Sequence, residues 1–260
     1  SSAASDVYKR QASVKEYGII ANNGYIHAVD RVVEPLETIY TELKNKEKYS
    51  TFLDLYDSFG VYVADDELSK SYAKAYGVDT LYQYQHGGLP NIACEWPTSS
   101  YLNFTALTAL SYSIFAPSNT AINSFFDSFW KIGGYSSMQE VDALALNYFL
   151  YQFIYGGSML FPEELGDDEL KNLAGSSLNI NPAALNEKTM CVNGALYGMD
   201  EIKEPSTFAS VIGPLFQYKS ARSFLYALLG SSLFSSYVSD LSKYICLLYT
   251  SDAADDLIGV

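Results

Sequence analysis

The sequence NGYIHAVDRVVEP, at residues 23–35, returns in altered form as NGALYGMDEIKEP at residues 193–205. Asn, Gly, Asp, Glu and Pro recur in register, and apolar residues fill most of the positions between them. The second copy begins 170 residues after the first (193 minus 23), which is too long for a solenoid repeat and matches the size of a whole domain. We therefore expect a section of a tandem array of compact domains, an organisation that favours surface binding over catalysis.

Each copy of this motif predicts a β-hairpin, because an Asn-Gly pair separates stretches of apolar residues. Gly24 and Gly194 are expected to adopt positive φ, and Asn23 and Asn193 tolerate the same backbone region. The proline that closes each copy cannot donate a hydrogen bond to a strand, so it ends the hairpin.

The remaining polar positions of the motif are expected to be structural. Asp30 and Asp200 are predicted to accept backbone hydrogen bonds at the end of the second strand. His27, which Tyr197 replaces in the second copy, is predicted to be a packed and hydrogen-bonded strand residue.

Both ends of the chain resemble translated adapter sequence. Residues 1–11 resemble the translation of a sequencing-library adapter, and residues 246–256 resemble the translation of its reverse complement. We therefore interpret residues 1–11 and 246–260 as adapter-derived and set them aside in considering the fold. The remaining residues, 12–245, would then lack both natural termini.

Composition argues against several classes of partner. The net charge is −14, and an acidic chain without basic clusters repels nucleic acid and anionic lipid. A hydrophobic content of 48% supports a packed core. The sequence has no run of 18 apolar residues, so it predicts no membrane-spanning helix. Outside the adapter-like tail only Cys94 and Cys191 remain, which is too few for a disulfide framework, so they are either bridged or free.

The sequence predicts no catalytic, metal or cofactor site. Its two histidines, His27 and His86, accompany neither a Gly-x-Ser-x-Gly elbow nor a reactive cysteine pattern. The acidic clusters at 65–67 and 163–169 lack the alternating ligands of a calcium loop and are expected to be solvated helix starts. Pairs of carboxylates that could hydrolyse a glycosidic bond stay open, because sequence does not show their separation.

Periodicity predicts a mixture of helices and strands. We expect mainly helix over 36–62, a polar helix over 65–76, a loop over 82–100, a strand over 102–115, and helices that start at 118 and 136. Ser50 is expected to cap the second half of the first helical segment, and Ser118 or Asn119 the helix that follows the strand. This pattern predicts an α+β fold.

These landmarks together resemble the fasciclin domain. Its first signature is a strand ending in Phe-Ala-Pro followed by a helix, which stands here as SIFAPSNTAI at 113–122 with Phe115, Ala116, Pro117 and Asn119. Its second signature is the repeated motif described above. Its third is a Tyr-His pair, which matches Tyr148 followed by Phe149 in place of histidine, a change that questions any receptor-binding role of this pair.

The resemblance implies a β-wedge of two small sheets flanked by helices. It places the end of a preceding domain at 12–35, a complete domain at 36–205, and the start of a following domain at 206–245. It also implies a non-enzymatic role in cell adhesion or protein interaction, on a protein that is secreted or lipoprotein-anchored at the cell surface. The long loop over 77–100 resembles the enlarged version of the domain found in gut Bacteroidetes.

The loop over 82–101 is the candidate binding segment. It sets aromatic and imidazole side chains among Gly and Pro, and these are Tyr82, Tyr84, His86, Trp96 and Tyr101. Such side chains anchor a protein partner, stack on a glycan, or pin the loop to its own domain. The adhesion module is our first hypothesis, and a glycan-binding module of a polysaccharide-uptake system is the alternative.

The segment 206–245 carries helices whose sheet would lie beyond it. Its apolar residues must either dock on the complete domain or remain exposed, and they are Phe224, Leu225, Leu228, Leu229 and Phe234.

Overall fold

The computed structural model describes most of the chain between its two ends. The described residues are 14–30, 36–93, 111–166, 169–178, 180–231 and 234. The expected adapter-derived ends, 1–11 and 246–260, lie outside the described residues, as do Cys94, Trp96 and Tyr101.

Both copies of the repeated motif belong to β-hairpins, as predicted. The first hairpin pairs β1 (Val14–Ala21) with β2 (Gly24–Val29) in antiparallel fashion. The second hairpin pairs β7 (Leu185–Cys191) with β8 (Gly194–Met199) in the same way. A two-residue turn joins the strands in each case, so the same local sequence gives the same local structure twice.

The second hairpin is half of the largest sheet, whose strand order is β6-β5-β8-β7. Here β5 (Tyr112–Pro117) runs parallel to β8 along its whole length, while β6 (Ile154–Tyr155) pairs with its other edge in antiparallel fashion. Parallel strands need a long connection, and helices fill the chain between these two. Five of the six residues of β5 are buried, which fits its central position in the sheet.

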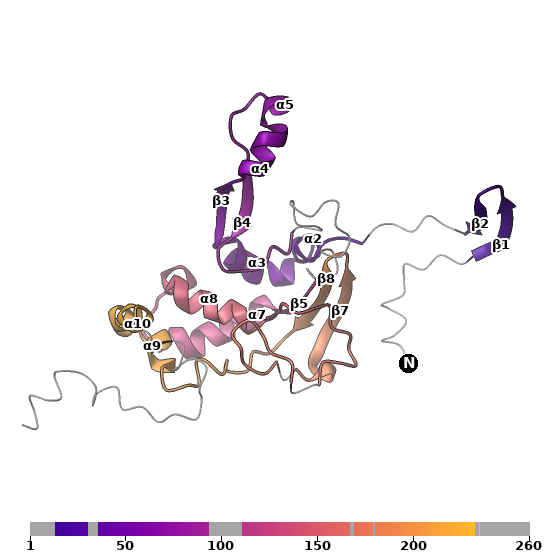
Figure 1. Cartoon of the computed structure of the whole chain (residues 1–260). Helices are drawn as coiled ribbons and strands as arrows, with labels where there is room; N and C mark the ends of the chain where they lie inside the picture. The colour runs from indigo at the N-terminus through magenta and orange to yellow at the C-terminus, as the bar shows by residue number, and fades with distance from the viewer. Residues whose placement is uncertain are drawn as a thin grey trace, which may run out of the picture.

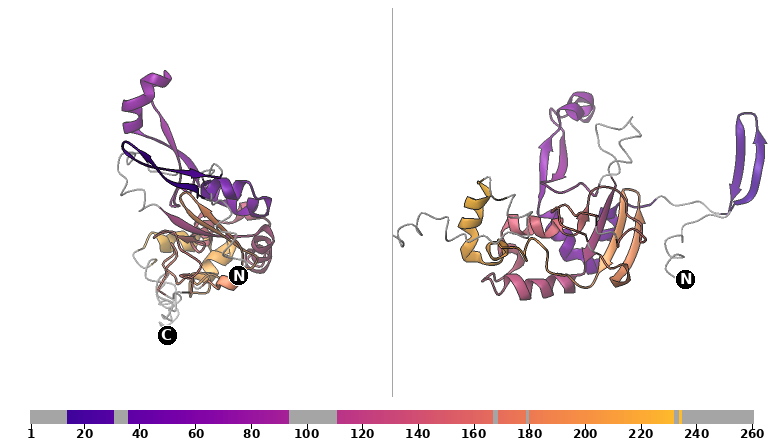
Figure 2. Two further views of the ribbon diagram at one scale, coloured as in Figure 1. Left: turned by 90° about the vertical axis from the view of Figure 1, so that its right-hand side faces the viewer. Right: turned by 60° about the horizontal axis from the view of Figure 1, so that its bottom comes forward.

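Eight α-helices lie between and after these strands in the described part of the chain. They are α2 (Ile39–Lys44), α3 (Ser50–Asp57), α4 (Asp66–Leu68), α5 (Lys74–Tyr76), α7 (Asn119–Phe125), α8 (Ala143–Tyr151), α9 (Gly213–Gln217) and α10 (Arg222–Leu229). Short 3-10 or π-helical segments occur at Glu47–Tyr49, Ser69–Ala73, Phe126–Trp130, Met138–Glu140, Pro182–Ala184 and Lys219–Ala221. Figures 1 and 2 show α3, α7 and α8 next to the four-stranded sheet.

Polar side chains begin the main helices. Thr38, Ser118 and Asp142 precede α2, α7 and α8, and each side chain accepts a hydrogen bond from a backbone N–H two or three residues later. Such caps satisfy N–H groups that have no partner within the helix. The cap predicted at Ser118 is therefore confirmed.

The core is unusually aromatic. Trp130 is fully buried and donates its indole N–H to the carbonyl of Phe216 at 3.1 Å. Rings that pack in contact with one another around it include Phe125, Phe129, Phe149, Phe153, Phe208 and Phe216. The α+β class with small sheets and packed helices is confirmed.

The segment after residue 205 docks on this core in part. Leu225, Leu228 and Phe234 are buried, whereas Phe224 and Leu229 keep 45% and 40% of their surface exposed. Polar contacts support the docking, because Asp142 Oδ2 forms an ion pair with Arg222 Nε at 2.7 Å and Asp142 Oδ1 accepts from the Tyr226 hydroxyl at 3.0 Å. Both outcomes considered from sequence, docking and exposure, therefore occur on one segment.

Three element predictions were wrong. The loop predicted over 82–100 begins with a strand, β4 (Tyr82–His86), and the helical segment predicted over 36–62 ends in the strand β3 (Gly60–Ala64). These two strands, each five residues long, pair with each other. The helix predicted to start at 136 instead starts at Ala143, after a 3-10 turn.

Candidate functional site

A finger, defined here as residues 60–86, is the candidate site. Its stem is the antiparallel pair β3–β4, and its tip carries α4 and α5, which Figure 1 shows rising away from the body of the domain. The polar helix predicted over 65–76 is confirmed as the tip, where Asp65 Oδ1 accepts from the backbone N–H of Leu68 at 2.9 Å. Gly77 ends it in the left-handed conformation, with φ of 69°, which glycine adopts without steric cost.

One side of the stem is a surface of tyrosines. Tyr62 pairs with Tyr84 across the two strands, and Tyr82 lies two residues from Tyr84, so all three side chains share one side of the ribbon. Their exposed fractions are 75% for Tyr62, 61% for Tyr82 and 39% for Tyr84. We name these three residues the tyrosine face.

The opposite side of the stem and the tip are also apolar and exposed. Val61 and Val63 lie on the opposite side of β3 and are 47% and 43% exposed, and Tyr72 and Tyr76 on the tip are 56% and 74% exposed. Exposed apolar residues therefore lie on both sides of the stem and on the tip, which makes the finger a candidate interaction surface.

Gly60 sets the position of Tyr84. A Cβ atom at residue 60 would overlap the hydroxyl end of the Tyr84 ring, so the absence of a side chain there lets the ring lie across the backbone. The centroids of the Tyr62 and Tyr84 rings are 5.0 Å apart, with an angle of 47° between the ring planes. The two rings are therefore in contact but are not coplanar.

The root of the finger is anchored by His86, which is only 3% exposed. Its Nε2 lies 3.1 Å from Asp57 Oδ1, and its ring packs on that of Tyr56 with centroids 3.9 Å apart. The other carboxylate oxygen of Asp57 accepts from the Tyr40 hydroxyl at 2.9 Å. Burial, together with this hydrogen bond to Asp57, raises the pKa of Tyr40 to about 12.

The structure thus divides the five predicted binding residues. Tyr82 and Tyr84 are exposed on the tyrosine face, whereas His86 turns inward, and Trp96 and Tyr101 lie outside the described residues. His86 is buried because the strand pairing places it at the stem root, against α3. Sequence analysis missed Tyr62, although the alternation Val61-Tyr62-Val63 is a strand signal.

The residues of the first fasciclin signature are structural. Phe115 and Ala116 are buried in β5, which ends at Pro117. Asn119 does not cap its own helix; its Oδ1 accepts from the backbone N–H of Thr51 at 2.9 Å, and its Nδ2 donates to the carbonyl of Glu47 at 2.9 Å.

Asn119 therefore caps α3, the role predicted for Ser50. The hydroxyl of Ser50 instead accepts from Asn119 Nδ2 at 3.0 Å, and the side chain of Ser50 makes no cap hydrogen bond to the helix. The two residues lie 69 positions apart, which is why local sequence did not indicate this cap.

The Tyr-Phe pair of the third signature is covered. Phe149 is fully buried in the aromatic core, which explains why an apolar ring stands there. Tyr148 is half-buried and its ring contacts those of Phe216 and Phe234, from the segment after residue 205.

In the second hairpin the asparagine and glycine of the motif are buried and closely packed. Asn193 is buried, its Oδ1 accepts from the backbone N–H of Ile39 at 2.9 Å, and its Nδ2 donates to the carbonyl of Ile92 at 2.7 Å. Gly194 has φ of 144°, as predicted, and a Cβ atom there would overlap the backbone of Tyr112.

In the first hairpin the matching residues are exposed. Asn23 and Gly24 are open to solvent, and Gly24 does not adopt the predicted positive φ. His27 Nδ1 accepts from the backbone N–H of Gly18 at 3.2 Å, so it is hydrogen-bonded as predicted, but the residue is exposed and its ring meets that of Tyr17 edge-on with centroids 6.0 Å apart. Asp30 lies 3.9 Å from Lys15 Nζ.

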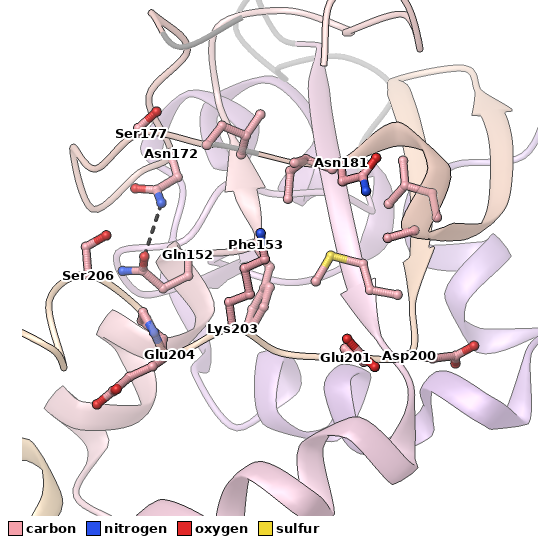
Figure 3. A pocket seen from close by; sticks show the side chains of 16 residues that line it. Gln152, Phe153, Asn172, Ser177, Asn181, Asp200, Glu201, Lys203, Glu204 and Ser206 are labelled. Atoms are coloured by element: carbon pink, nitrogen blue, oxygen red, sulfur yellow. Dashed lines mark hydrogen bonds between the residues drawn. The ribbon is translucent and has the colours of Figure 1, made fainter. Parts of the chain in front are cut away.

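A pocket of about 480 Å³ lies beside the end of β8 (Figure 3). Phe153, Leu178 and Met199 supply apolar walls, and Gln152 Oε1 accepts from Asn172 Nδ2 at 3.1 Å within it. Charged side chains lie along its lining, namely Asp200, Glu201, Lys203 and Glu204.

Asp200 is exposed on this pocket, and no hydrogen bond to its carboxylate is found among the described residues, in contrast to the expected backbone hydrogen bonds. Within the same described ranges, no group of three His, Cys, Asp or Glu side chains is arranged to hold a metal ion. None of the described helices is long and apolar enough to cross a membrane.

No protein-family model matches the chain, and no curated protein is significantly similar to it. Among solved structures, the chain is similar to a FAS1 domain pair from the insect cell adhesion molecule fasciclin I, with 14% sequence identity and a TM-score of 0.39. The match covers 74% of this chain and 60% of the other, so this chain spans less than two thirds of that structure.

Proposed function

We propose that the chain is part of a non-catalytic protein of fasciclin-type domains, secreted or lipoprotein-anchored, which acts in adhesion or protein interaction at the cell surface. The family part of this proposal is supported by three sequence signatures that occur in order at domain spacing. The binding part is carried by one observation, the exposed tyrosine face on a projecting finger.

The proposal includes a domain arrangement. Residues 36–205 form one domain, 12–35 end a preceding one, and 206–245 begin a following one. Support comes from two repeated blocks: the two hairpins at a spacing of 170 residues, and the 3-10 segment and helix at 47–57, which recur at 219–229. The second block has a spacing of 172 residues (219 minus 47).

The tyrosine face suits contact with a protein. Tyrosine combines a large apolar ring with a polar hydroxyl, and it loses little conformational entropy on binding because only two torsions are fixed. Tyr62 and Tyr84 already contact each other, and Gly60 leaves room for the ring of Tyr84, so part of the surface is ordered before a partner arrives.

An adhesion assay tests the proposal. Beads coated with the full chain are measured for adhesion to immobilised copies of the chain and to immobilised extracellular-matrix proteins. The double variant Tyr62→Ala/Tyr82→Ala should lose adhesion by at least about tenfold, because truncating central aromatic residues removes most of the binding energy of an interface.

Tyr17→Ala/Tyr25→Ala is the matched control, since these tyrosines of the first hairpin are 74% and 72% exposed. Equal adhesion by the wild type and both double variants would contradict a binding role for the tyrosine face. Equal losses in both variants would indicate non-specific stickiness of exposed tyrosine.

Glycan binding is the second candidate function, favoured by the exposure of Tyr82 and Tyr84 on one side of the stem. The 47° angle between the Tyr62 and Tyr84 rings argues against a flat platform for a sugar. A glycan array with the full chain, Tyr82→Ala and Trp96→Ala separates the two functions. Glycan binding that either variant abolishes would replace the protein-interaction proposal.

A further inference from the structure

His86 lies where the finger joins the domain. It is the last residue of β4, and the next backbone N–H, that of Gly87, donates to the carbonyl of Phe59 at 2.9 Å. The backbone N–H of Leu89 donates to the carbonyl of His86 at 3.1 Å. The imidazole therefore lies at the junction between the stem and the body of the domain.

Three side chains contact the imidazole, and a fourth contacts the carboxylate beside it. Asp57 accepts from one ring nitrogen, Tyr56 packs against the ring, and Tyr84 meets it edge-on with centroids 5.0 Å apart. Tyr40 donates its hydroxyl to the same carboxylate that His86 contacts. Asp57 is the only charged group among them, and its side chain is 33% exposed.

The second ring nitrogen is unsatisfied. Nδ1 of His86 is buried and has no hydrogen-bond partner among the described residues. In the neutral ring, Nε2–H donates to Asp57 and Nδ1 carries only a lone pair. Protonation would add a buried N–H donor with no acceptor, and such a group is costly because it has lost its water. The neutral ring fits this site and the charged ring does not.

We infer that His86 is a proton-operated latch at the root of the finger, closed when the imidazole is neutral and released when it takes a proton. Release frees the stem from α3 and changes how the tyrosine face is presented. The latch itself stands on the geometry of the root; only its consequence for binding rests on the proposed function.

The direction of the pH response follows from the burial. Burial lowers the pKa of His86 from its ordinary value of 6.5, and it outweighs the opposing hydrogen bond and charge of Asp57. The closed state therefore holds fewer protons than the released state, so the closed state is fully favoured above about pH 6.5 and weakens below it. One proton changes the opening constant by at most about tenfold per pH unit.

Hydrogen exchange at the root measures the latch in the full chain. After correction for intrinsic exchange, opening at the amides of Gly87 and Leu89 should increase between pH 7.5 and 5.5, by up to about tenfold. Amides of β5 and β8 should keep their protection over this range, which separates release from unfolding. In His86→Gln, which cannot take a proton, opening at the root should not depend on pH.

Imidazole titration by NMR provides a test that needs no change at residue 86. The chain has two histidines, so His27→Gln leaves His86 as the single signal. A pKa below 6.5 is expected, and Asp57→Asn should lower it further by removing the anion. A pKa at or above 6.5, or an equal pH response in wild type and His86→Gln, would overturn the latch.

The two proposals fail separately. If root opening responds to pH while Tyr62→Ala/Tyr82→Ala adheres like wild type, the latch stands and the proposed binding surface is wrong. If that variant loses adhesion but root opening is independent of pH, the surface stands and the latch is wrong.

Discussion

The two hairpins share a sequence motif and a strand pairing, but they differ in what surrounds them. In the second hairpin, the first five residues of β8 are buried, whereas in the first hairpin Tyr25 and Ile26 of β2 are 72% and 55% exposed. The second hairpin has β5 along one edge and the start of α2 at its turn. Figures 1 and 2 show the first hairpin apart from the four-stranded sheet.

The comparison shows that the motif forms the same hairpin in both places, whereas its contacts depend on the elements that surround it. In both copies a two-residue turn that ends in asparagine, followed by glycine as the first residue of the next strand, joins the strands of a hairpin. The asparagine and glycine that the two copies share, however, contact other elements only in the second hairpin, where β5 and α2 are present. The same motif therefore forms a two-stranded sheet in the first hairpin and part of a four-stranded sheet in the second.

The largest contrast is expected at the turn glycine. Gly194→Ala should destabilise the domain by about 3–5 kcal/mol, because residue 194 has φ of 144° and the new methyl group would overlap the backbone of Tyr112. Gly24→Ala should cost less than about 1 kcal/mol, since nothing lies within 4 Å of that position. Urea unfolding followed by Trp130 fluorescence in a Trp96→Phe background measures both. Equal costs would mean that the two turns are in equivalent surroundings.

A smaller contrast is expected at the preceding asparagine. Asn193→Ala should cost about 2–4 kcal/mol, because it removes two buried hydrogen bonds and leaves the backbone N–H of Ile39 without its acceptor. Asn23→Ala, at an exposed position, should change stability by less than about 0.5 kcal/mol. The same unfolding assay applies. A cost at Asn193 below 1 kcal/mol would show that the turn tolerates loss of its contacts to α2.

The smallest contrast concerns the loss of folding stability at low pH. Glu187 of β7 accepts from Lys46 at 2.6 Å and from Lys48 and Tyr49 at 2.9 Å. Burial acts to raise its pKa, but these hydrogen bonds outweigh burial and lower the pKa to about 2. A lowered pKa in the folded state means stability that is complete above about pH 4.5 and is lost as pH falls toward 2.

Glu187→Gln should remove this acid-dependent loss, which we expect to be about 1–2 kcal/mol for a partly solvated carboxylate. The matched position in the first hairpin is Tyr17, so Tyr17→Phe should leave the pH profile of urea unfolding as it is in the wild type. An unchanged profile in Glu187→Gln would assign the acid response to other carboxylates.

The fold was predictable where signals are local. The hairpins, the cap at Ser118 and the helix that Asp65 begins all depend on residues within a few positions of one another. Predictions failed at Asn119, which caps a helix some 69 positions back along the chain, and at β4, a strand only through its pairing with β3. At the candidate site, sequence named Tyr82 and Tyr84, which are exposed, but the burial of His86 depends on the position of α3.

The sequence alone determined the repeat, the hairpins and the α+β class, because turn chemistry and apolar periodicity act over short stretches of chain. Only the tertiary structure decided which copy of the hairpin is buried, which aromatic residues of the finger face solvent, and where His86 lies. Burial depends on groups that are distant in the sequence, and a side chain carries no mark of whether those groups will surround it.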